Sequence, residues 1–347
     1  MSRELFGASL AELRQVIENT GEQPFRAKQL FHSLYAEHRW KFAEMTNLPL
    51  GLRARLAAEA QLTPPQIKSQ YRSSDGTVRY IMAVANGHSV ETVFMPEARR
   101  QTICISTQAG CPLDCGFCLT ATLGLLRNLS TGEIVGQVLV TLEGNRAQLK
   151  PQTNVVLMGM GEPMLNYENV MAAVRILADA NGVSVPLRKI TLSTAGVVPG
   201  IRRLAEEPIR PKLAISLNAT TDEVRTHLMP LNKKWPIAEL LAACREYPLR
   251  PWERLTFEYV LLKEINDTPE DARRLVRLLS NLRAKVNLIP WNPAPELPFE
   301  APGEDRILAF QEILTGKNIP TFIRRSRGQD IMAACGQLAL TEGTTAG

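Results

Sequence analysis

Three closely spaced cysteines are the residues of this sequence best suited to chemistry. Cys111, Cys115 and Cys118 directly follow a strand-like run over residues 102–107. A cubane iron–sulfur cluster has four irons, and electron-transfer ferredoxins normally hold each iron with a thiolate. Three thiolates leave one iron open to a chelating substrate. The spacing therefore predicts a [4Fe-4S] cluster with one open iron.

Other interpretations of these cysteines explain less. A structural zinc site needs four ligands, and neither a second cysteine pair nor a histidine lies near this loop. A thioredoxin-like Cys-x-x-Cys motif would use Cys115 and Cys118 but leave Cys111 idle. Reduced cysteines often pack in cores, but a loop with proline, aspartate and glycine makes poor core.

Two further cysteines carry no motif of their own. Cys104 lies in the middle of the predicted strand, where the pattern favours a buried structural thiol. Cys335 lies in a glycine-bounded loop near the end of the chain, and the pattern allows either a structural or a reactive thiol there. Cys244, inside a predicted helix, is interpreted as structural.

The chain from residue 98 to 340 alternates strands and helices. A Ser130–Glu133 capping box and Thr268-Pro269 each open a helix. Six strand–helix units predict an α/β fold with a parallel sheet curved into an incomplete (β/α)6 barrel. The strands are expected at residues 103–106, 155–158, 190–193, 213–217, 257–261 and 286–289, with a further strand at 321–325.

Polar residues follow several of these strands. Gly159-Met-Gly-Glu-Pro163 comes after the second, and its Glu162 is suited to an ammonium group. In such barrels the chemistry gathers at the carboxyl ends of the strands. The remaining candidates at this rim are Ser193, Ser216, Asn218 and Asn292. Together with an open iron they outline a pocket for S-adenosylmethionine, whose amino and carboxylate groups can chelate iron.

Two smaller units precede the barrel. Residues 1–62 read as a helical domain, opened by a capping box of Ser9 and Glu12. Residues 63–97 alternate in hydrophobicity around Asp75-Gly76 and Asn86-Gly87, which predicts an antiparallel β meander. Residues 341–347 are expected to form a flexible tail.

Glu91 is a carboxylate in an apolar part of this meander. It shares a strand face with Val93 and Met95. The pattern alone favours a partly exposed residue paired with Arg99 or Arg100 over a catalytic base.

Composition narrows the class of protein. The chain has 347 residues, a net charge of +5 and a pI near 8.9, which favour a polyanionic partner without identifying one. No run approaches the ~18 apolar residues of a membrane span, and no apolar signal segment begins the chain. The six cysteines do not suggest a disulfide framework. We expect a cytoplasmic enzyme in a reducing compartment.

The chain resembles the radical S-adenosylmethionine RNA methyltransferases of the RlmN/Cfr family, and the RlmN-type adenine-C2 branch in particular. The resemblance covers nearly the whole chain. It rests on Gly21-Glu-Gln-Pro-Phe-Arg26, Val90-Glu-Thr-Val93, the three cysteines, Arg127-Asn-Leu129, Gly159 to Pro163, Arg327-Gly-Gln-Asp330 and Ala334-Cys-Gly-Gln337.

The resemblance implies roles for single residues. Glu91 would accept a proton, Cys335 would carry the methyl group and Cys104 would resolve the covalent intermediate. Cys111, Cys115 and Cys118 would bind the cluster. The residues implied to contact S-adenosylmethionine are Gly161, Glu162, Ser193, Ser216, Leu217, Asn218 and Asn292. Many relatives have histidine at position 218, so the geometry of that contact differs here.

The implied reaction uses two molecules of S-adenosylmethionine per turnover. Cys335 takes a methyl group from the first, and the reduced cluster cleaves the second to a radical that activates this S-methyl group for addition to adenine. Glu91 then removes a proton from the adduct. Cys104 attacks the sulfur of Cys335, and the transient disulfide frees the methylated base.

The family also implies partners, and it implies that the helical domain, residues 1–62, helps to hold folded RNA. Members of the C2 branch modify adenosine 2503 of 23S rRNA and adenosine 37 of certain tRNAs, and the cluster needs an electron donor such as flavodoxin or ferredoxin. The basic cluster of Arg324, Arg325 and Arg327 is suited to RNA phosphates. We expect a monomer. Two alternatives stay open: a C8 methyltransferase of the Cfr branch, and a non-catalytic iron–sulfur RNA-binding protein.

Overall fold

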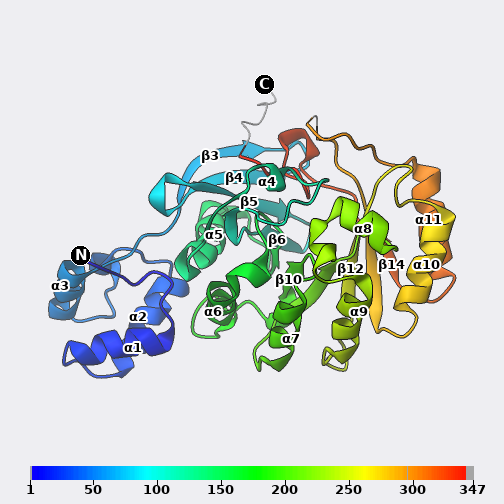
Figure 1. Ribbon diagram of the computed structural model, residues 1–347. Helices are drawn as coiled ribbons and strands as arrows, with labels where there is room; N and C mark the ends of the chain where they lie inside the picture. The colour runs from blue at the N-terminus through cyan, green and yellow to red at the C-terminus, as the bar shows by residue number, and fades with distance from the viewer. Residues whose placement is uncertain (1, 295, 341–347) are drawn as a thin grey trace.

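A strongly curved sheet of ten strands organises the protein (Figure 1). The computed structural model describes residues 2–294 and 296–340. The strand order is β14-β13-β12-β11-β10-β9-β6-β5-β4-β3. The bounds are β3 (Gln66–Arg72), β4 (Val78–Ala83), β5 (Ser89–Pro96), β6 (Arg100–Cys104), β9 (Gln152–Leu157), β10 (Ile190–Thr194), β11 (Lys212–Ser216), β12 (Leu255–Leu261), β13 (Ala284–Pro290) and β14 (Thr321–Ile323).

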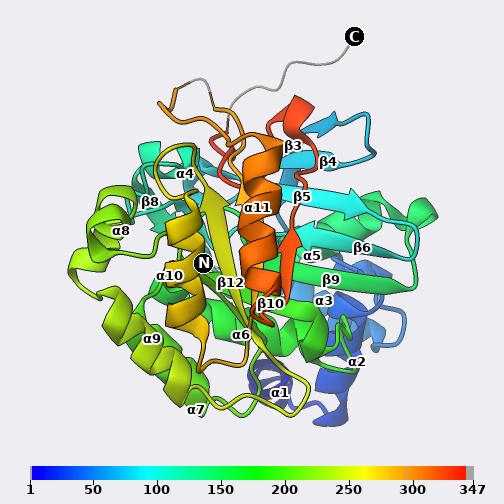
Figure 2. The ribbon, with the colours of Figure 1, turned by 90° about the vertical axis from the view of Figure 1, so that its right-hand side faces the viewer.

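The expected (β/α)6 arrangement is confirmed. All neighbours from β6 through β14 pair in parallel. Helices connect these strands and cover the outer side of the sheet (Figure 2). They are α5 (Thr131–Gly144), α6 (Tyr167–Ala178), α7 (Val198–Glu206), α8 (Asp222–Leu228), α9 (Ile237–Glu246), α10 (Pro269–Leu279) and α11 (Glu304–Thr315). Capping boxes open α5 and α10 at the expected residues.

The two faces of the parallel sheet differ in polarity. Residues such as Val155, Leu192 and Phe257 point towards the helices and are buried at 0% exposure. Their strand neighbours point the other way because side chains alternate along a strand. These inner residues include Cys104, Ser193, Lys212, Thr256, Glu258, Lys285 and Asn287. The core therefore lies between the sheet and its helices, while the inside of the barrel is polar and open to a ligand.

The meander is present and continues the central sheet. β3 pairs with β4, β4 with β5 and β5 with β6, all antiparallel. Asn86 and Gly87 both have positive φ, at 60° and 75°, as the turn signal predicts. Because the meander and the barrel form one sheet, β5 places Glu91 beside the first barrel strands.

The helical start of the chain is also confirmed. It contains α1 (Leu10–Asn19), α2 (Phe25–Tyr35) and α3 (Leu50–Glu59), and the capping box of Ser9 and Glu12 opens α1. Strands β1 (Arg3–Glu4) and β2 (Ala60–Gln61) pair in parallel and close this domain.

Some short elements were not expected from the sequence. A hairpin of β7 (Gln108–Gly110) and β8 (Leu125–Asn128) flanks the cysteine loop, and α4 (Leu119–Thr122) follows Cys118. Short 3₁₀ helices are η1 (Phe42–Glu44), η2 (Ala85–Gly87), η3 (Arg146–Gln148), η4 (Pro163–Asn166), η5 (Leu187–Lys189), η6 (Pro230–Lys233) and η7 (Gln329–Ile331). The predicted tail, 341–347, lies outside the described residues. No helix of the described chain is long and apolar enough to cross a membrane.

Candidate active site

A cavity at the carboxyl ends of the parallel strands brings most of the predicted site residues together. It encloses about 1030 Å³ of empty space, its open mouth included. The predicted residues that line it are Cys111, Cys115, Cys118, Gly161, Glu162, Ser193, Ser216, Asn218, Asn292 and Cys335. Residues far apart in the sequence thus share one rim, as the strand-end rule predicts.

The β7–β8 hairpin fixes the start of the cysteine loop. Gly110 has φ 75°, and a Cβ placed there would lie 1.8 Å from the carbonyl oxygen of Gly124. The amide of Cys111 donates to that same oxygen at 2.9 Å. Further along, the amide of Gly116 donates to the carbonyl of Leu228. The loop is therefore held at both ends, and only glycine fits at position 110.

The three thiols have the chemistry that an iron–sulfur cluster requires. Burial, together with the charges of Glu162 and Cys118, raises the pKa of Cys111 to about 12, although a hydrogen bond from the backbone of Leu113 opposes the shift. The pKa values of Cys115 and Cys118 are raised by burial as well. Three neighbouring thiolates repel one another, so these thiols can ionise together only around a cationic group. The irons of a cluster supply such positive charge, because metal sites bind cysteine as the thiolate. These residues fit the cluster that the sequence predicts.

No three His, Cys, Asp or Glu side chains of the described residues are arranged to hold a single metal ion. The three thiols line one cavity without forming such a group. The thiols that hold a cubane need not converge on one point, because each thiol binds a different iron.

The glycine-rich turn after β9 brings Glu162 into the cavity wall. Gly161 has φ 98°, and a Cβ there would lie 2.5 Å from Cβ of Gln108. The carboxylate of Glu162 accepts hydrogen bonds from the amides of Met164 at 3.1 Å and Ala195 at 2.7 Å. Burial raises the pKa of Glu162 to about 7, although the Ala195 amide opposes the shift. Glu162 can therefore meet a cationic ligand as a carboxylate just above neutral pH.

Arg225 holds the rim on the other side, a role that the sequence did not reveal. Its fully buried guanidinium donates to the carbonyl oxygens of Leu217 at 3.1 Å, Ala195 at 2.6 Å and Ser216 at 3.2 Å. It also donates to Oδ1 of Asn232 at 2.9 Å. One side chain thus ties the ends of β10 and β11 together.

Asn218 and Leu217 occupy different places at this rim. Asn218 has φ 57°, and its Oδ1 accepts from the amide of Val260 at 2.9 Å. Leu217 is fully buried and does not line the cavity with its side chain. Any contact of Leu217 with a ligand would pass through its backbone.

Cys335 sits on a loop that packs against the cysteine loop. The amide of Leu119 donates to the carbonyl of Gly336 at 2.8 Å, and Nδ2 of Asn292 donates to the carbonyl of Cys335 at 2.9 Å. Gln329 in turn donates to Oδ1 of Asn292 at 2.8 Å. Cys335 is exposed, whereas Cys104 is buried.

A second cavity of about 1470 Å³ contains both Cys104 and Cys335. Arg324 lines both cavities, and so does Glu258, whose buried Oε2 lies 3.7 Å from Nη1 of Arg324. Burial raises the pKa of Cys104 to about 12; a charge on Cys335 raises it too, while Arg324 lowers it. Cys335 therefore stands where the two cavities meet. Glu258 and Arg324 lie beside it, and spacing alone could not have identified this pair.

Glu91 is placed differently from the pattern-based expectation. Its side chain is completely buried, and its partner is Arg79 on the neighbouring strand. The expected pairing with Arg99 or Arg100 is wrong, since Arg100 pairs with Glu97. Antiparallel strand pairing, rather than closeness in sequence, brings Arg79 to Glu91.

The carboxyl group of Glu91 lines neither cavity in this structure. The backbone of Ala339 and Leu340 lies beside it, and Oε2 has no hydrogen-bond partner of good geometry among the described residues. Burial raises the pKa of Glu91 to about 7, against the charge of Arg79. This value suits a proton acceptor, provided that the substrate can reach it.

Comparisons with known proteins agree over nearly the whole chain. Residues 105–279 match the model of the radical SAM superfamily, and residues 3–62 match that of a ribosomal RNA large subunit methyltransferase N-terminal domain. The chain is 49% identical to a probable dual-specificity RNA methyltransferase RlmN from Koribacter versatilis, covering 94% of this chain and 99% of that protein. It is 47% identical to the dual-specificity RNA methyltransferase RlmN of Anaeromyxobacter dehalogenans, covering 95% and 90%.

A solved structure supports the same relationship. The crystal structure of a radical SAM methyltransferase from Sphaerobacter thermophilus superposes with a TM-score of 0.91. The two chains are 44% identical, and the match covers 97% of this chain and 99% of that one.

Proposed function

Because the chain belongs to the RlmN family of radical SAM RNA methyltransferases, we propose that it methylates carbon 2 of adenine in RNA. The proposed targets are adenosine 2503 of 23S rRNA and adenosine 37 of tRNA. The observation that carries the proposal is the position of Cys335. Its exposed side chain lines both the cavity of the cluster cysteines and the cavity that contains Cys104.

Cys111, Cys115 and Cys118 would hold the [4Fe-4S] cluster, with one iron free for S-adenosylmethionine. When bound, the cluster supplies the electron that starts the radical chemistry of this superfamily. Glu162 would bind the ammonium group of S-adenosylmethionine. The other proposed contacts to it are Gly161, Ser193, Ser216, Asn218, Asn292 and the backbone of Leu217. A reductant such as flavodoxin or ferredoxin, a monomeric state and a cytoplasmic location belong to the same proposal.

Cys335 is the proposed carrier of the one-carbon unit. Carbon 2 of adenine lies between two ring nitrogens and does not attack a sulfonium methyl group by itself. The Cys335 sulfur does so instead, and S-adenosylhomocysteine leaves. The S-methyl group would then lose one hydrogen atom to the radical derived from a second S-adenosylmethionine, and its carbon would bond to carbon 2 of the base. The adduct would also give up one electron, which the oxidised cluster can accept, before the base is released. The exposure of Cys335 allows both S-adenosylmethionine and RNA to reach it from the two cavities.

Cys104 is the proposed resolving residue. Its thiolate attacks the Cys335 sulfur, an S–S bond forms and the S–C bond breaks. The electron pair stays with the carbon, which takes up a proton and becomes the methyl group of the product. An external thiol or reductase must then reduce the disulfide. Glu91 would remove the proton from carbon 2, which requires the segment at Ala339 and Leu340 to move aside.

Analysis of the product tests the proposal directly. Purified protein with its cluster, a reductant and S-adenosylmethionine is incubated with unmodified 23S rRNA and, separately, with tRNA. The nucleosides are then separated by liquid chromatography and identified by mass spectrometry, with standards of both methyladenosine isomers. We expect 2-methyladenosine from both RNAs. If the only product is 8-methyladenosine, the chain is a C8 methyltransferase. If neither RNA yields a methylated adenosine, the proposal is wrong.

A further inference from the structure

The polar inside of the barrel continues from Cys335 to the opposite end of the strands. The cavity that holds Cys104 and Cys335 shares Lys212, Thr256 and Lys285 with another cavity of about 1450 Å³. That other cavity is lined by residues at the starts of β9 through β13. Together the two cavities form one trough, which we call the barrel trough.

Strand register places two lysines in this trough. Lys212 pairs with Thr191, and Lys285 pairs with Thr256, and all four residues line the cavity of Cys335. Lys285 lies four residues before Ile289, at about 3.3 Å per residue along β13. The lysine end is therefore separated from the cysteine end by roughly 13 Å along the strand.

Five cations line the lower cavity, and none of them forms an ion pair with a described residue. They are Arg188, Lys189, Lys212, Arg254 and Lys285. The acidic residue of the lining is Glu253, which faces Arg250 at 3.5 Å. Lys189 donates to Gln152, a neutral residue.

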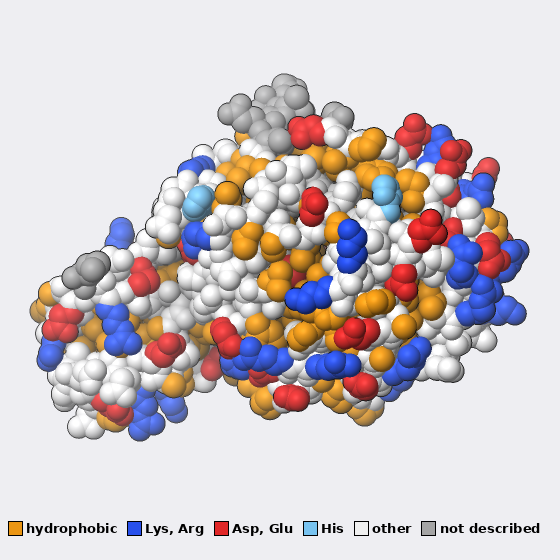
Figure 3. Space-filling view, in the orientation of Figure 1, with side chains coloured by type: hydrophobic (Ala, Val, Ile, Leu, Met, Phe, Trp, Pro, Cys, Tyr) orange, Lys and Arg blue, Asp and Glu red, His pale blue; other side chains and the backbone are white. Residues whose placement is uncertain are grey.

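The upper part of the trough and the outer surface are different. Arg324 faces Glu258, Arg325 pairs with Glu304, and Arg327 pairs with Asp75. On α10 and its surroundings, acidic and basic side chains are interspersed (Figure 3). Positive charge is thus in excess at the lysine end of the trough, where the five cations outnumber the one carboxylate among the described lining residues, Glu253. There, burial lowers the pKa of Lys212, the charges of Lys285 and Lys189 lower it further, and Glu253 offsets part of this shift.

We propose that the barrel trough binds the sugar–phosphate backbone of RNA next to the methylated adenosine, with phosphates at Lys212 and Lys285. The inference rests on the proposed function, which requires an adenine at Cys335. A chain that leaves Cys335 along the trough meets the unpaired cations of the lower cavity. Trp252, which is 55% exposed at the same mouth, offers a ring on which a base can stack.

RNA fits this trough better than a small anion does. The cations are spread over a lining formed by the starts of several strands, and a single phosphate could occupy only part of it. A polyanion with regularly spaced charges can neutralise them together and release the counterions held there.

A double variant, Lys212→Gln with Lys285→Gln, tests the trough. Affinity is measured at several KCl concentrations with the holoenzyme and a transcript of 23S rRNA containing the target adenosine. We expect at least tenfold weaker binding at low salt. The slope of log K against log salt should fall by about 1.4, since each single-strand phosphate contact contributes about 0.7.

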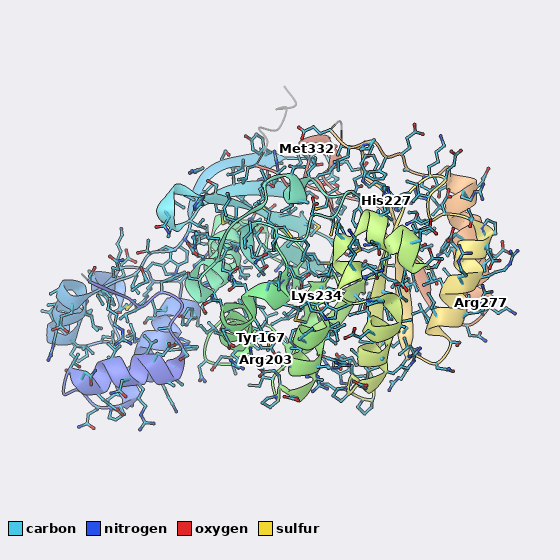
Figure 4. All side chains as sticks on the ribbon, in the orientation of Figure 1. Tyr167, Arg203, His227, Lys234, Arg277 and Met332 are labelled. Atoms are coloured by element: carbon cyan, nitrogen blue, oxygen red, sulfur yellow. The ribbon has the colours of Figure 1, made fainter. Side chains whose placement is uncertain are left out.

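A matched control removes two positive charges elsewhere. Arg273 and Arg277 lie on α10, where Arg277 extends from the outer side of the barrel (Figure 4). Arg273→Gln with Arg277→Gln should leave the affinity and the salt slope unchanged. Both double variants should keep the wild-type rate of S-adenosylmethionine cleavage without RNA.

A third variant guards against simple damage to the cavity. Lys212→Arg with Lys285→Arg keeps both charges and should retain the wild-type salt slope. An unchanged slope in the glutamine variant would overturn the proposal. So would polyglutamate of equal charge that competes as well as RNA, because the trough would then be a general anion site.

The proposed function can fail separately. If the wild-type enzyme yields no 2-methyladenosine while RNA binding still depends on the two lysines, the methylation assignment is wrong and the trough stands. If methylation proceeds and the lysines do not affect RNA binding, the methylation assignment stands and the trough proposal is wrong.

Discussion

At the scale of single residues, Cys335 and Cys104 differ in the property that matters most for a thiol. Cys335 is exposed and lines the cavity of Cys111, Cys115 and Cys118, whereas Cys104 is buried and burial raises its pKa to about 12. A buried thiol with a high pKa is a poor nucleophile until a charge nearby stabilises its thiolate. Arg324 supplies that charge, and this fits a Cys104 that reacts only after the adduct has formed at Cys335.

Replacing the two cysteines should therefore stop the reaction at different points. Cys335→Ala should form no bond to RNA, yet still cleave S-adenosylmethionine. Cys104→Ala should form the bond at Cys335 and fail to break it, because no other described cysteine outside the cluster loop lines that cavity. Denaturing gels and peptide mass spectrometry would detect the crosslink. Multiple turnover by Cys104→Ala without a crosslink would make Cys104 a structural thiol, and Cys244→Ala serves as the control.

Glu162 gives a second prediction at this scale, on pH. Its pKa of about 7 means that the carboxylate forms as the pH rises from 6 to 8, so S-adenosylmethionine should bind more tightly over this range. Glu162→Gln should bind it about tenfold more weakly and without this pH dependence, since a charged hydrogen bond of at least ~1.4 kcal/mol is lost. Anaerobic calorimetry on the holoenzyme measures both.

The exposed Glu168→Gln, which removes a carboxylate from the outer surface, should change neither property. The free protein should also lose stability as the pH rises from 4.5 to 7, because the unfolded carboxyl ionises first. A Glu162→Gln protein with wild-type affinity at every pH would show that another group binds the ammonium.

Residue identity was predictable where spacing along the chain encodes it. The three cysteines stand within eight residues, and the sequence suffices to find them. The partners of buried charges were not predictable in this way. Arg79 reaches Glu91 across two paired strands. Arg225 lies on α8 and donates to the carbonyl groups of Ala195 and Ser216 at the ends of two strands. Such pairs depend on tertiary structure, which sequence spacing does not contain.

At the scale of elements, hydrophobic period and turn residues predicted the parallel strands and most helices. The β7–β8 hairpin was not predicted, because strands of three and four residues carry no readable period. This hairpin nevertheless fixes the position of Cys111, because the amide of Cys111 donates to the carbonyl of Gly124. The shortest elements thus do much of the positioning at the site.

The β3–β4 hairpin holds the segment that leads to Cys335. Asp75 accepts from the amide of Gly328 at 3.1 Å, and Asp330 accepts from Oγ of Ser73 at 2.6 Å. Burial alone would raise the pKa of Asp75, but hydrogen bonds from Thr77 and Gly328 outweigh it and lower the pKa to about 2. The two carboxylates form a reciprocal clamp.

Removing the clamp should loosen the Cys335 loop. In Asp75→Asn with Asp330→Asn, we expect roughly tenfold faster hydrogen–deuterium exchange in residues 327–335 and faster alkylation of Cys335, since two charged acceptors are lost. In the wild type, loosening should appear only as the pH falls from about 4 towards 2. The control is Asp305→Asn on α11. Equal exchange in both proteins would mean that the loop is held by its contacts to the cysteine loop instead.

At the scale of the whole molecule, the helical domain packs directly on the first barrel helix. A Cβ on Gly132 of α5 would lie 2.2 Å from the carbonyl oxygen of Phe6, and a Cβ on Gly136 would lie 2.9 Å from Cε1 of Phe6. The hydroxyl of Tyr35 accepts from the amide of Gly7 at 3.0 Å and donates to the carbonyl of Ala8 at 2.8 Å. The helical domain is therefore seated against α5 with no space for an added side chain.

This close packing predicts a way to separate RNA recognition from cofactor chemistry. Gly132→Ala forces Phe6 away from α5 at a cost of about 1–3 kcal/mol, and so displaces the helical domain. The atoms nearest to the Cβ added at Gly132 all belong to Phe6, and Phe6 does not line the cavity of Cys111, Glu162 and Cys335, so cofactor binding in that cavity should be unaffected. We expect methylation of rRNA to fall at least tenfold, while cleavage of S-adenosylmethionine without RNA continues at its normal rate.

The chain offers a matched control in Gly51 of α3, where an added Cβ meets nothing within 4 Å. Gly51→Ala should keep full methylation and gain up to about 1 kcal/mol of stability, because alanine favours the helix. Small-angle scattering would report the displaced domain in Gly132→Ala. If methylation and cofactor cleavage fall together, α5 instead transmits the change to the barrel. If neither falls, the helical domain does not need its seat on α5 to present RNA to Cys335.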